Sequence, residues 1–196
     1  MAAKITATMS RWQPDAAGRL QQAAFELYAE RGYEETTVAE IAERAGLTER
    51  TFFRHFADKR EVLFGGSDQL QQLIVDAVEA APSSATPMQA IAGGLAAAGA
   101  IFDASRRPYS RQRQAVIDAN PELQERELVK LASLAGALAD ALRRRGLQDP
   151  AAELTAEAGV AVFRVAFEHW IRDESDREFA HFVNQGLAEL RTVAAG

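Results

Sequence analysis

Side chains that donate hydrogen bonds to anions gather between Thr48 and Lys59. They are two threonines, two arginines, a histidine and a lysine: Thr48, Arg50, Thr51, Arg54, His55 and Lys59. Guanidinium groups bind phosphates and the edges of guanine bases through paired hydrogen bonds, and ammonium groups bind phosphates by charge. Between Arg44 and Arg60 the chain carries five basic residues against two acidic ones, although its net charge is −6. This local positive surface on an acidic protein favours contact with nucleic acid.

Capping signals divide this part of the chain into short helices. Three positions carry side chains that cap helix N-termini, two of them with capping-box spacing: Thr48, Thr37 with Glu40, and Asp58 with Glu61. Gly46 predicts a sharp turn after a helix that ends near Ala45, because glycine adopts the left-handed conformation without steric cost. The spacing therefore predicts two short helices in close succession.

Apolar residues predict how these two helices pack. One face of each helix and the turn between them are apolar: Val38, Ile41, Ala42, Ala45, Leu47, Phe52 and Phe56. When those faces meet, Glu49, Arg50, Phe53 and Arg54 point outward. A second helix that presents its first residues in this way is the arrangement of a helix-turn-helix, which enters the major groove of DNA. The alternative is an ordinary helical corner whose basic residues are only solvated.

The segment from Gly32 to Phe64, GYEETTVAEIAERAGLTERTFFRHFADKREVLF, resembles the signature of the TetR family of bacterial transcriptional repressors. AAFELYAERGY, just upstream, resembles the first helix of that domain. Seven residues occupy family-typical positions: Thr37, Ala42, Gly46, Thr48, His55, Phe56 and Lys59. Two residues depart from the pattern, since Arg50 replaces a small residue and Phe53 replaces a phosphate-contacting tyrosine.

We expect two kinds of DNA contact from this surface. Phosphates should be bound by Thr37, Thr48, His55 and Lys59, whereas base edges should be read by Arg50, Thr51 and Arg54. Arg50 is the strongest candidate for reading guanine, because its fork matches two acceptors on that base. Phe53 can pack against a sugar or a thymine methyl, but it has no hydroxyl to donate. An N-terminal arm over residues 1–13, with Arg11 and Trp12, either reaches a minor groove or is only solvated.

The rest of the chain is predicted to be helical, and the fold all-α with about nine helices. The expected helices span 14–31, 59–81 with a kink at Gly65-Gly66, 88–104, 108–119, 121–145, 150–171 and 176–194. Two domains are expected: a three-helix DNA-binding domain over residues 1–60, and a helical ligand-binding and dimerisation bundle over 61–196. Residues 1–60 carry nine acidic and nine basic side chains, while the remainder carries 19 and 13. DNA should repel that acidic bundle and bind only the first domain.

Composition and spacing argue against an enzyme. The chain has no cysteine, which excludes disulfides, thiolate metal sites and a cysteine nucleophile. Glu178 and His181 have the spacing of a di-iron ligand pair, but the pair occurs once and such sites need two. Gly93-Gly94 and Gly99 follow no strand, so they favour close helix packing over nucleotide binding. We expect no catalytic residue, metal or cofactor.

Two further absences bear on the location of the protein. The sequence has no apolar run long enough to span a bilayer and no signal-peptide pattern. We therefore expect a cytoplasmic protein without a membrane partner.

A ligand pocket inside the second domain is implied by the TetR resemblance. The candidate lining residues are apolar or aromatic, with one arginine for an anionic group: Leu95, Phe102, Arg113, Ile117, Phe163, Phe167 and Trp170. The last three fall on one stripe of a helix. Core packing explains that stripe without any ligand, so both interpretations remain open.

A homodimer is expected from the last two helices. The helix over 150–171 is apolar nearly all round and must be covered on both sides. The following helix carries a stripe of apolar and small residues, which we expect at a two-fold interface: Phe179, Phe182, Val183, Gly186, Leu187 and Leu190.

These features predict a sequence-specific DNA-binding transcriptional regulator. The favoured function is a dimeric repressor that binds a palindromic operator in double-stranded DNA. A small-molecule ligand should release it by shifting the population toward a form whose two DNA-binding domains no longer match successive major grooves. One alternative is a helical small-molecule-binding protein or enzyme with an incidental helix-turn-helix. Another is an activator or a ligand-independent regulator.

Overall fold

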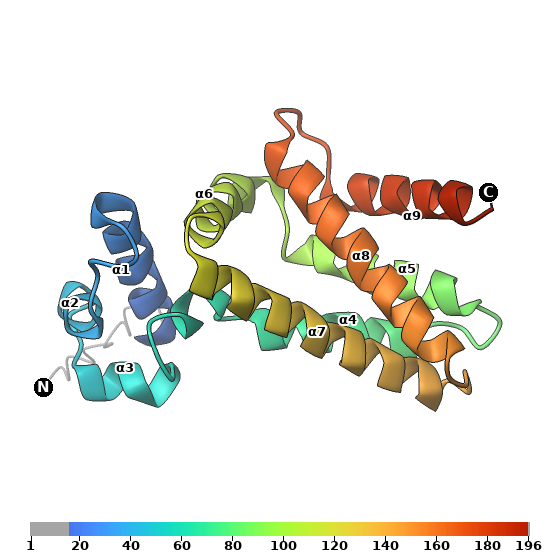
Figure 1. The fold of residues 1–196 in the computed structure, drawn as a ribbon, viewed down its shortest axis with the longest axis horizontal. Coiled ribbons are helices and arrows are strands. Elements are labelled where there is room, and N and C mark those ends of the chain that lie inside the picture. The colour runs from blue at the N-terminus through green and yellow to red at the C-terminus, as the bar shows by residue number, and fades with distance from the viewer. Residues whose placement is uncertain (1–15, 196) are drawn as a thin grey trace, which may run out of the picture. The chain divides into compact units, whose positions relative to one another are not determined.

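A computed structural model describes residues 16–195, and over these residues the secondary structure is entirely helical (Figure 1). Nine α-helices and three 3-10 helices follow one another along this part of the chain, which confirms the predicted all-α fold. The chain divides into two compact units between Gly65 and Gly66. The predicted arm over residues 1–13, with Arg11 and Trp12, lies outside the described residues.

The first unit consists of α1 (Ala16–Arg31), α2 (Val38–Arg44), α3 (Glu49–His55) and the 3-10 helix η1 (Glu61–Phe64). Helix α1 packs against the other three elements. Four side chains in this small core have no exposed surface: Leu20, Ala24, Ile41 and Phe52. The first helix therefore covers the inner face of α2 and α3, and their other face stays in solvent.

The predicted helix from Lys59 to Ala81 is wrong. Instead η1 makes one short turn, and α4 (Ser67–Glu79) begins separately after two glycines. Gly66 has a φ of +93°, which ends the preceding turn instead of kinking a continuous helix. Asp58 accepts hydrogen bonds from the backbone N–H groups of Arg60, at 2.8 Å, and Glu61, at 3.3 Å. Its side chain therefore closes a tight turn and does not start a long helix.

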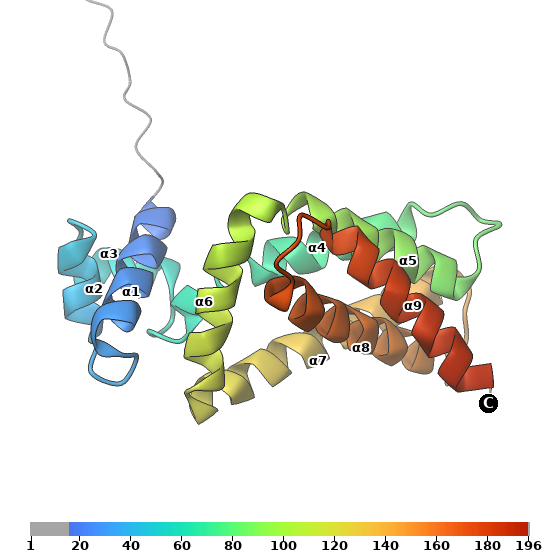
Figure 2. The ribbon, with the colours of Figure 1, turned by 90° about the horizontal axis from the view of Figure 1, so that it is seen from above.

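The second unit contains α4, α5 (Pro87–Ala97), α6 (Arg107–Asp118), α7 (Pro121–Arg144), α8 (Ala151–Arg172) and α9 (Phe179–Ala195). Helix α8 packs against α5, α6, α7 and α9 (Figure 2). The predicted helix over 88–104 is shorter than expected: α5 ends at Ala97, and two 3-10 helices, η2 (Ala98–Ala100) and η3 (Ala104–Arg106), lead to α6.

Two buried glycines set the spacing of helices around α5. A Cβ atom on Gly94 would lie 2.7 Å from Val78 Cγ2, and one on Gly159 would lie 2.7 Å from Ile91 Cγ2. Both distances are too short for a side chain, so α5 approaches α4 and α8 more closely than larger residues allow. Gly94 thus serves close packing, whereas a Cβ on Gly93 or Gly99 would have no neighbour within 4 Å.

Candidate functional site

The start of α2 is held by the predicted capping box. The backbone N–H of Glu40 donates to the Thr37 hydroxyl at 3.3 Å, and the N–H of Thr37 donates to the Glu40 carboxylate at 2.9 Å. Arg31 adds an ion pair to the same carboxylate at 2.6 Å. The hydrogen bonds from Thr37, together with Arg31, hold the pKa of Glu40 below its usual range. The exposed Thr37 therefore has a fixed position at the helix start.

The turn between α2 and α3 is locked around Gly46, which has a φ of +63°. The N–H of Gly46 donates to the carbonyl of Glu43 at 2.9 Å, and the N–H of Leu47 donates to the carbonyl of Ala42 at 2.8 Å. This pair of bonds is a Schellman motif. Arg19, on α1, donates to the carbonyls of Ala45 and Gly46 from outside the turn. The angle at which α3 leaves α2 is thus determined by backbone bonds.

Helix α3 is oriented by its cap and by one buried ring. The Thr48 hydroxyl accepts the N–H of Thr51 at 3.2 Å, so the first turn begins as predicted. Phe52 is completely buried, and its ring centroid lies 5.7 Å from that of Phe56. With Phe52 fixed inward, the opposite face of the helix must point to solvent.

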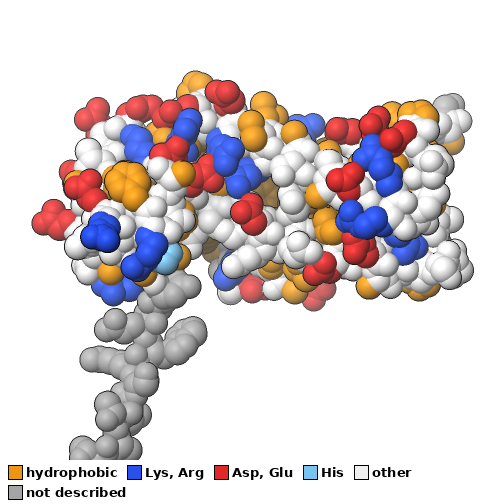
Figure 3. Space-filling model, turned by 90° about the horizontal axis from the view of Figure 1, so that it is seen from below, with side chains coloured by type: hydrophobic (Ala, Val, Ile, Leu, Met, Phe, Trp, Pro, Cys, Tyr) orange, Lys and Arg blue, Asp and Glu red, His pale blue; other side chains and the backbone are white. Residues whose placement is uncertain are grey.

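That outward face carries most of the residues predicted to bind DNA. The exposed ones are Thr37 at the start of α2 and five residues of α3 and its cap: Thr48, Arg50, Phe53, Arg54 and His55. Phe53 is 55% exposed, which is unusual for a large aromatic side chain and leaves its ring available to a partner. Thr51 is half-buried. Figure 3 shows basic side chains gathered over the first unit beside exposed hydrophobic ones.

The arginines of the first unit fall into two groups. Arg44 binds Glu30 through two bonds of 2.8 Å, and Arg60 pairs with Asp58 at 2.6 Å. Arg50 and Arg54, in contrast, form no ion pair or hydrogen bond with any of the residues from 16 to 195. Within the described part of the chain, the guanidinium groups on α3 therefore have donors free for a partner, whereas Arg44 and Arg60 already have carboxylate partners.

Lys59 differs from the other residues predicted to contact DNA, because its ammonium group already has partners in the chain. Its ammonium donates to three carbonyls of the loop between α1 and α2: those of Tyr33 at 3.0 Å, Glu34 at 3.2 Å and Thr36 at 3.3 Å. It also lies 4.2 Å from the centroid of the Tyr33 ring. An ammonium has three N–H groups, so these bonds use its full donor capacity. No sequence signal points to this role, because the acceptors are backbone atoms.

In the second unit, four predicted ligand residues form one aromatic cluster. The ring of Phe102 has centroid distances of 6.0 Å to Phe163, 5.3 Å to Phe167 and 5.6 Å to Trp170. A fifth ring, that of Phe179, lies 4.9 Å from Phe102. We call these five rings the aromatic cluster. Sequence reasoning missed Phe179 as a member, because it lies on the next helix.

The other predicted ligand residues are Leu95, Ile117 and Arg113. Leu95 and Ile117 have no exposed surface. Leu95 belongs to the same hydrophobic core as the aromatic cluster, whereas Ile117 lies outside that core. Arg113 is half-buried, 3.9 Å from the carboxylate of Glu127, and burial lowers the pKa of its guanidinium.

The stripe of α9 that was expected at a dimer interface faces the core of its own chain. Phe179, Phe182, Val183 and Leu187 are at most 5% exposed, and Gly186 and Leu190 are half-buried. Their packing against α8 and α5 covers most of this stripe within the chain. The stripe thus helps to cover α8 from within the same chain, and its place in a dimer interface stays a prediction.

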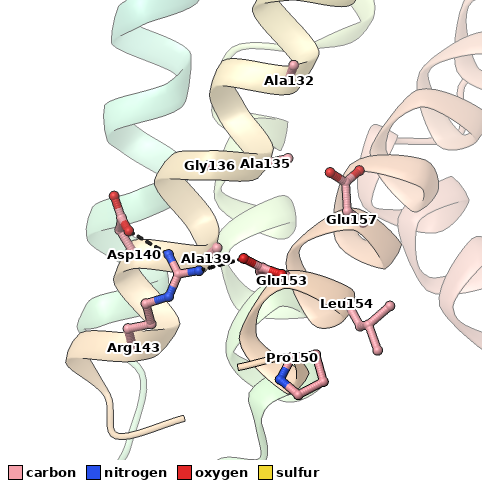
Figure 4. Close-up of a pocket in the computed structure, with 10 residues that line it drawn as sticks. All are labelled: Ala132, Ala135, Gly136, Ala139, Asp140, Arg143, Pro150, Glu153, Leu154 and Glu157. Atoms are coloured by element: carbon pink, nitrogen blue, oxygen red, sulfur yellow. Dashed lines mark hydrogen bonds and ion pairs between the residues drawn. The ribbon is translucent and has the colours of Figure 1, made fainter. Parts of the chain in front are cut away.

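An open groove of about 590 Å³ runs between α7 and α8 (Figure 4). Its floor consists of small residues of α7: Ala132, Ala135, Gly136 and Ala139. Arg143 closes one end through ion pairs with Asp140 at 2.8 Å and Glu153 at 3.1 Å. None of the predicted ligand residues lines this groove, so the sequence did not indicate it.

Comparison with known proteins identifies both units. Residues 20–64 match the model of bacterial regulatory proteins of the tetR family, and residues 85–195 match that of the MftR C-terminal domain. The chain belongs to the TetR family. It is a DNA-binding transcriptional regulator, as predicted, and the interpretation as an enzyme with an incidental helix-turn-helix is not favoured.

Individual relatives support this TetR-family assignment. The chain is 30% identical over 170 residues to the HTH-type transcriptional regulator TcmR of Streptomyces glaucescens, covering 82% of this chain and 75% of TcmR. It is 32% identical over 162 residues to the protein named as mycofactocin biosynthesis regulator MftR in Mycobacterium tuberculosis, with 80% of each chain covered. The transcriptional regulator FadR of Bacillus subtilis, solved with stearoyl-CoA, shares the fold with a TM-score of 0.59 and 19% identity, covering 88% of this chain and 96% of FadR.

Among residues 16–195, no helix is long and apolar enough to cross a membrane. The same part of the chain contains no group of three or more histidine or acidic residues placed to hold a metal ion.

Proposed function

We propose that this TetR-family protein is a dimeric repressor that binds a palindromic operator through α3 and is released by a small molecule. The observation that carries the proposal is the contrast among arginines: Arg50 and Arg54 are exposed on α3 and have no partner among residues 16–195, while Arg44 and Arg60 are held by carboxylates. An exposed guanidinium with all its donors available is suited to a base edge or a phosphate.

The roles of individual residues follow from their positions on α3 and at its ends. Arg50, in the first turn, reads a guanine, while Thr51 and Arg54 contact neighbouring base edges. Thr37, Thr48 and His55 lie at the ends of α2 and α3 and bind phosphates on either side. Phe53 packs its exposed ring against a sugar or a thymine methyl group.

We assign Lys59 a different role from the phosphate contact that the sequence suggested. Its three bonds fix the loop that leads into Thr37, and the Tyr28 hydroxyl holds the Lys59 carbonyl at 2.8 Å. To bind a phosphate, the ammonium would have to give up these acceptors. Lys59 therefore positions α2 relative to α1 and supports DNA binding indirectly.

The proposed dimer uses the outward face of α8 in place of the buried stripe of α9. Leu154 is 67% and Val165 is 41% exposed, and Ala158 and Ala161 lie between them at helical spacing. A second copy meeting this stripe about a two-fold axis would cover the apolar side that its own chain leaves open. Two linked α3 helices would then bind a palindrome far more tightly than one.

The ligand is expected to act on the second unit and to shift the population away from the DNA-binding form. Acyl-CoA thioesters are sensible first compounds to screen, because FadR, which shares the fold, was solved with stearoyl-CoA. This function requires no catalytic residue, metal or cofactor.

A mobility-shift titration with the DNA upstream of the protein's own gene and its neighbours tests the proposal. We expect saturable, salt-sensitive binding to a palindromic fragment and release of that fragment by one class of small molecule. Val165→Glu should leave the fold intact, produce monomers in light scattering, and weaken operator binding by about 100-fold or more. A dimeric Val165→Glu protein with parental affinity would contradict the proposed interface.

A further inference from the structure

Phe102 differs from the other members of the aromatic cluster in the element that carries it. Phe163, Phe167 and Trp170 belong to α8, and Phe179 begins α9. Phe102 instead lies between the 3-10 helices η2 and η3, in the connection from α5 to α6. Its ring is thus inserted among four helical rings from a segment that is itself not α-helical.

The backbone around Phe102 is held only by local bonds. The N–H of Phe102 donates to the carbonyl of Ala98 at 3.1 Å, and the Asp103 carboxylate accepts the N–H groups of Ser105, at 2.8 Å, and Arg106, at 3.1 Å. Phe102 is half-buried, whereas Trp170 and Phe179 have no exposed surface. The ring can therefore leave the cluster without breaking a helix, and its departure uncovers Trp170 and Phe179, which another ring could then cover.

Arg107 supplies a polar group beside Trp170, one ring of the aromatic cluster. Its guanidinium lies 5.3 Å from the centroid of the Trp170 ring, and its side chain is 9% exposed. It donates to the carbonyls of Asp173, Ser175 and Arg177 in the turn between α8 and α9, and lies 3.5 Å from the Asp173 carboxylate. Its Nε is buried and has no hydrogen-bond partner in the described chain. A buried donor without an acceptor is costly, so an acceptor oxygen placed at this atom would be stabilising.

We propose that Phe102 occupies, in the free protein, a binding site for a flat aromatic carboxylate. This inference rests on the proposed ligand-responsive function and names the ligand class and the residue that regulates access. The ligand ring takes the place of the Phe102 ring among Phe167, Trp170 and Phe179, where aromatic edges and faces favour another aromatic ring. A carboxylate oxygen of the ligand accepts the hydrogen bond of Arg107 Nε. Displacement of Phe102 then moves the connection between α5 and α6.

Calorimetric titration with 2-naphthoate tests this site in the full-length protein. The parent should bind weakly but saturably at millimolar concentration, because the ligand must first displace the Phe102 ring. Phe102→Ala should bind at least about tenfold more tightly, since removing the competing ring makes the competent form the major one. Phe102→Trp, whose larger ring keeps the site filled, should bind more weakly than the parent. A parent that shows no binding, or variants with unchanged affinity, would overturn the proposal.

Two controls address the chemistry of the ligand and of Arg107. Decanoate has the same charged group on an aliphatic chain, and we expect it to bind at least about tenfold more weakly than 2-naphthoate to Phe102→Ala. Arg107→Lys keeps the positive charge but lacks Nε, and it should reduce 2-naphthoate affinity while retaining the parental circular dichroism spectrum at room temperature. Equal binding of both acids, or a folded Arg107→Lys protein with parental affinity, would count against the assignment.

Operator binding separates failure of this inference from failure of the proposed function. Phe53→Ala, a matched change in the first unit, should leave 2-naphthoate binding unchanged. The parent protein without ligand should shift the operator fragment. If the parent shifts DNA but no variant responds to 2-naphthoate, only the assigned ligand site is wrong. If the parent fails to bind DNA, the repressor function itself is wrong.

Discussion

Helices α3 and α9 were both expected to present a binding surface, and the structure treats them differently. On α3, Arg50, Phe53 and Arg54 are exposed, as their positions opposite Phe52 predicted. On α9, the apolar stripe that includes Phe182 and Leu187 is buried in its own chain. Polar residues on one face of a short helix indicate that this face is exposed, because a polar face that has no partner in the protein must contact solvent. An apolar stripe shows only that something must cover it, and that cover is here provided by α8 and α5.

The largest effect on stability is expected when a charge is introduced into the buried stripe of α9. Leu187→Glu should destabilise the second unit by about 3–5 kcal/mol, because it leaves an unpaired charge in an apolar core. Leu187 is 4% exposed in the single chain. Thermal unfolding followed by circular dichroism measures the loss, and Val165→Glu, on the exposed face of α8, should keep a cooperative transition and lose only the stabilisation that dimerisation supplies. A Leu187→Glu protein that is a stable, folded monomer would restore α9 as the interface.

The second prediction concerns the exposed face of α3. It compares the loss of an arginine on this face with the loss of an arginine that is held by a carboxylate. Arg50→Ala should weaken operator binding by about 1–3 kcal/mol and relax the preference at one base position, because a bidentate guanine contact is lost. Arg44→Ala is the matched control, since Arg44 is already bound to Glu30 and should change affinity little. Mobility shifts with single-base operator variants measure both effects. Equal losses in the two variants would remove the distinction between paired and unpaired arginines.

The third prediction concerns a smaller effect and distinguishes two roles for Lys59. The residue either holds the loop over 33–36 in position or contacts a phosphate. Lys59→Met removes three hydrogen bonds to the loop over 33–36 and should lower stability by about 1–3 kcal/mol. The salt dependence of DNA binding should keep its slope, because no phosphate contact is lost. Arg54→Ala should instead preserve stability and weaken operator binding, because Arg54 contacts a base edge and does not hold this loop. A Lys59→Met protein with parental stability and a reduced slope would show that Lys59 is a phosphate ligand.

The smallest effect concerns the acid stability of the capping box. The pKa of Glu40 is lowered by its bonds with Thr37 and Arg31, so its stabilising contribution is present above the unfolded-state pKa. As pH falls through the lower folded-state pKa, protonation removes that contribution. Glu40→Gln should therefore change the pH dependence of unfolding below about pH 4 to 5 and leave its shape at neutral pH unaltered. Unfolding curves recorded between acidic and neutral pH measure the difference, and identical acid limbs would exclude a role for Glu40.

Sequence alone determined the features that depend on neighbours a few residues apart. The capping box of Thr37 and Glu40, the turn at Gly46 and the cap at Thr48 are local hydrogen-bond patterns, so residue types and spacing were sufficient. The outward face of α3 followed from the position of Phe52 on the same helix. Local signals also have limits, since the cap at Asp58 was read as the start of a long helix, and the φ of Gly66 ends the turn instead.

Only the tertiary structure decided the features whose partners lie far along the chain. Lys59 binds carbonyls of Tyr33, Glu34 and Thr36. Every residue has a backbone carbonyl, so the sequence does not reveal which of them accept these hydrogen bonds. Phe102 joins rings from α8 and α9, and Arg107 binds carbonyls between those two helices. The inward direction of the α9 stripe depended on which helix covers α8. Periodicity identifies an apolar face, but the choice of its partner is made by packing among all the helices of the unit.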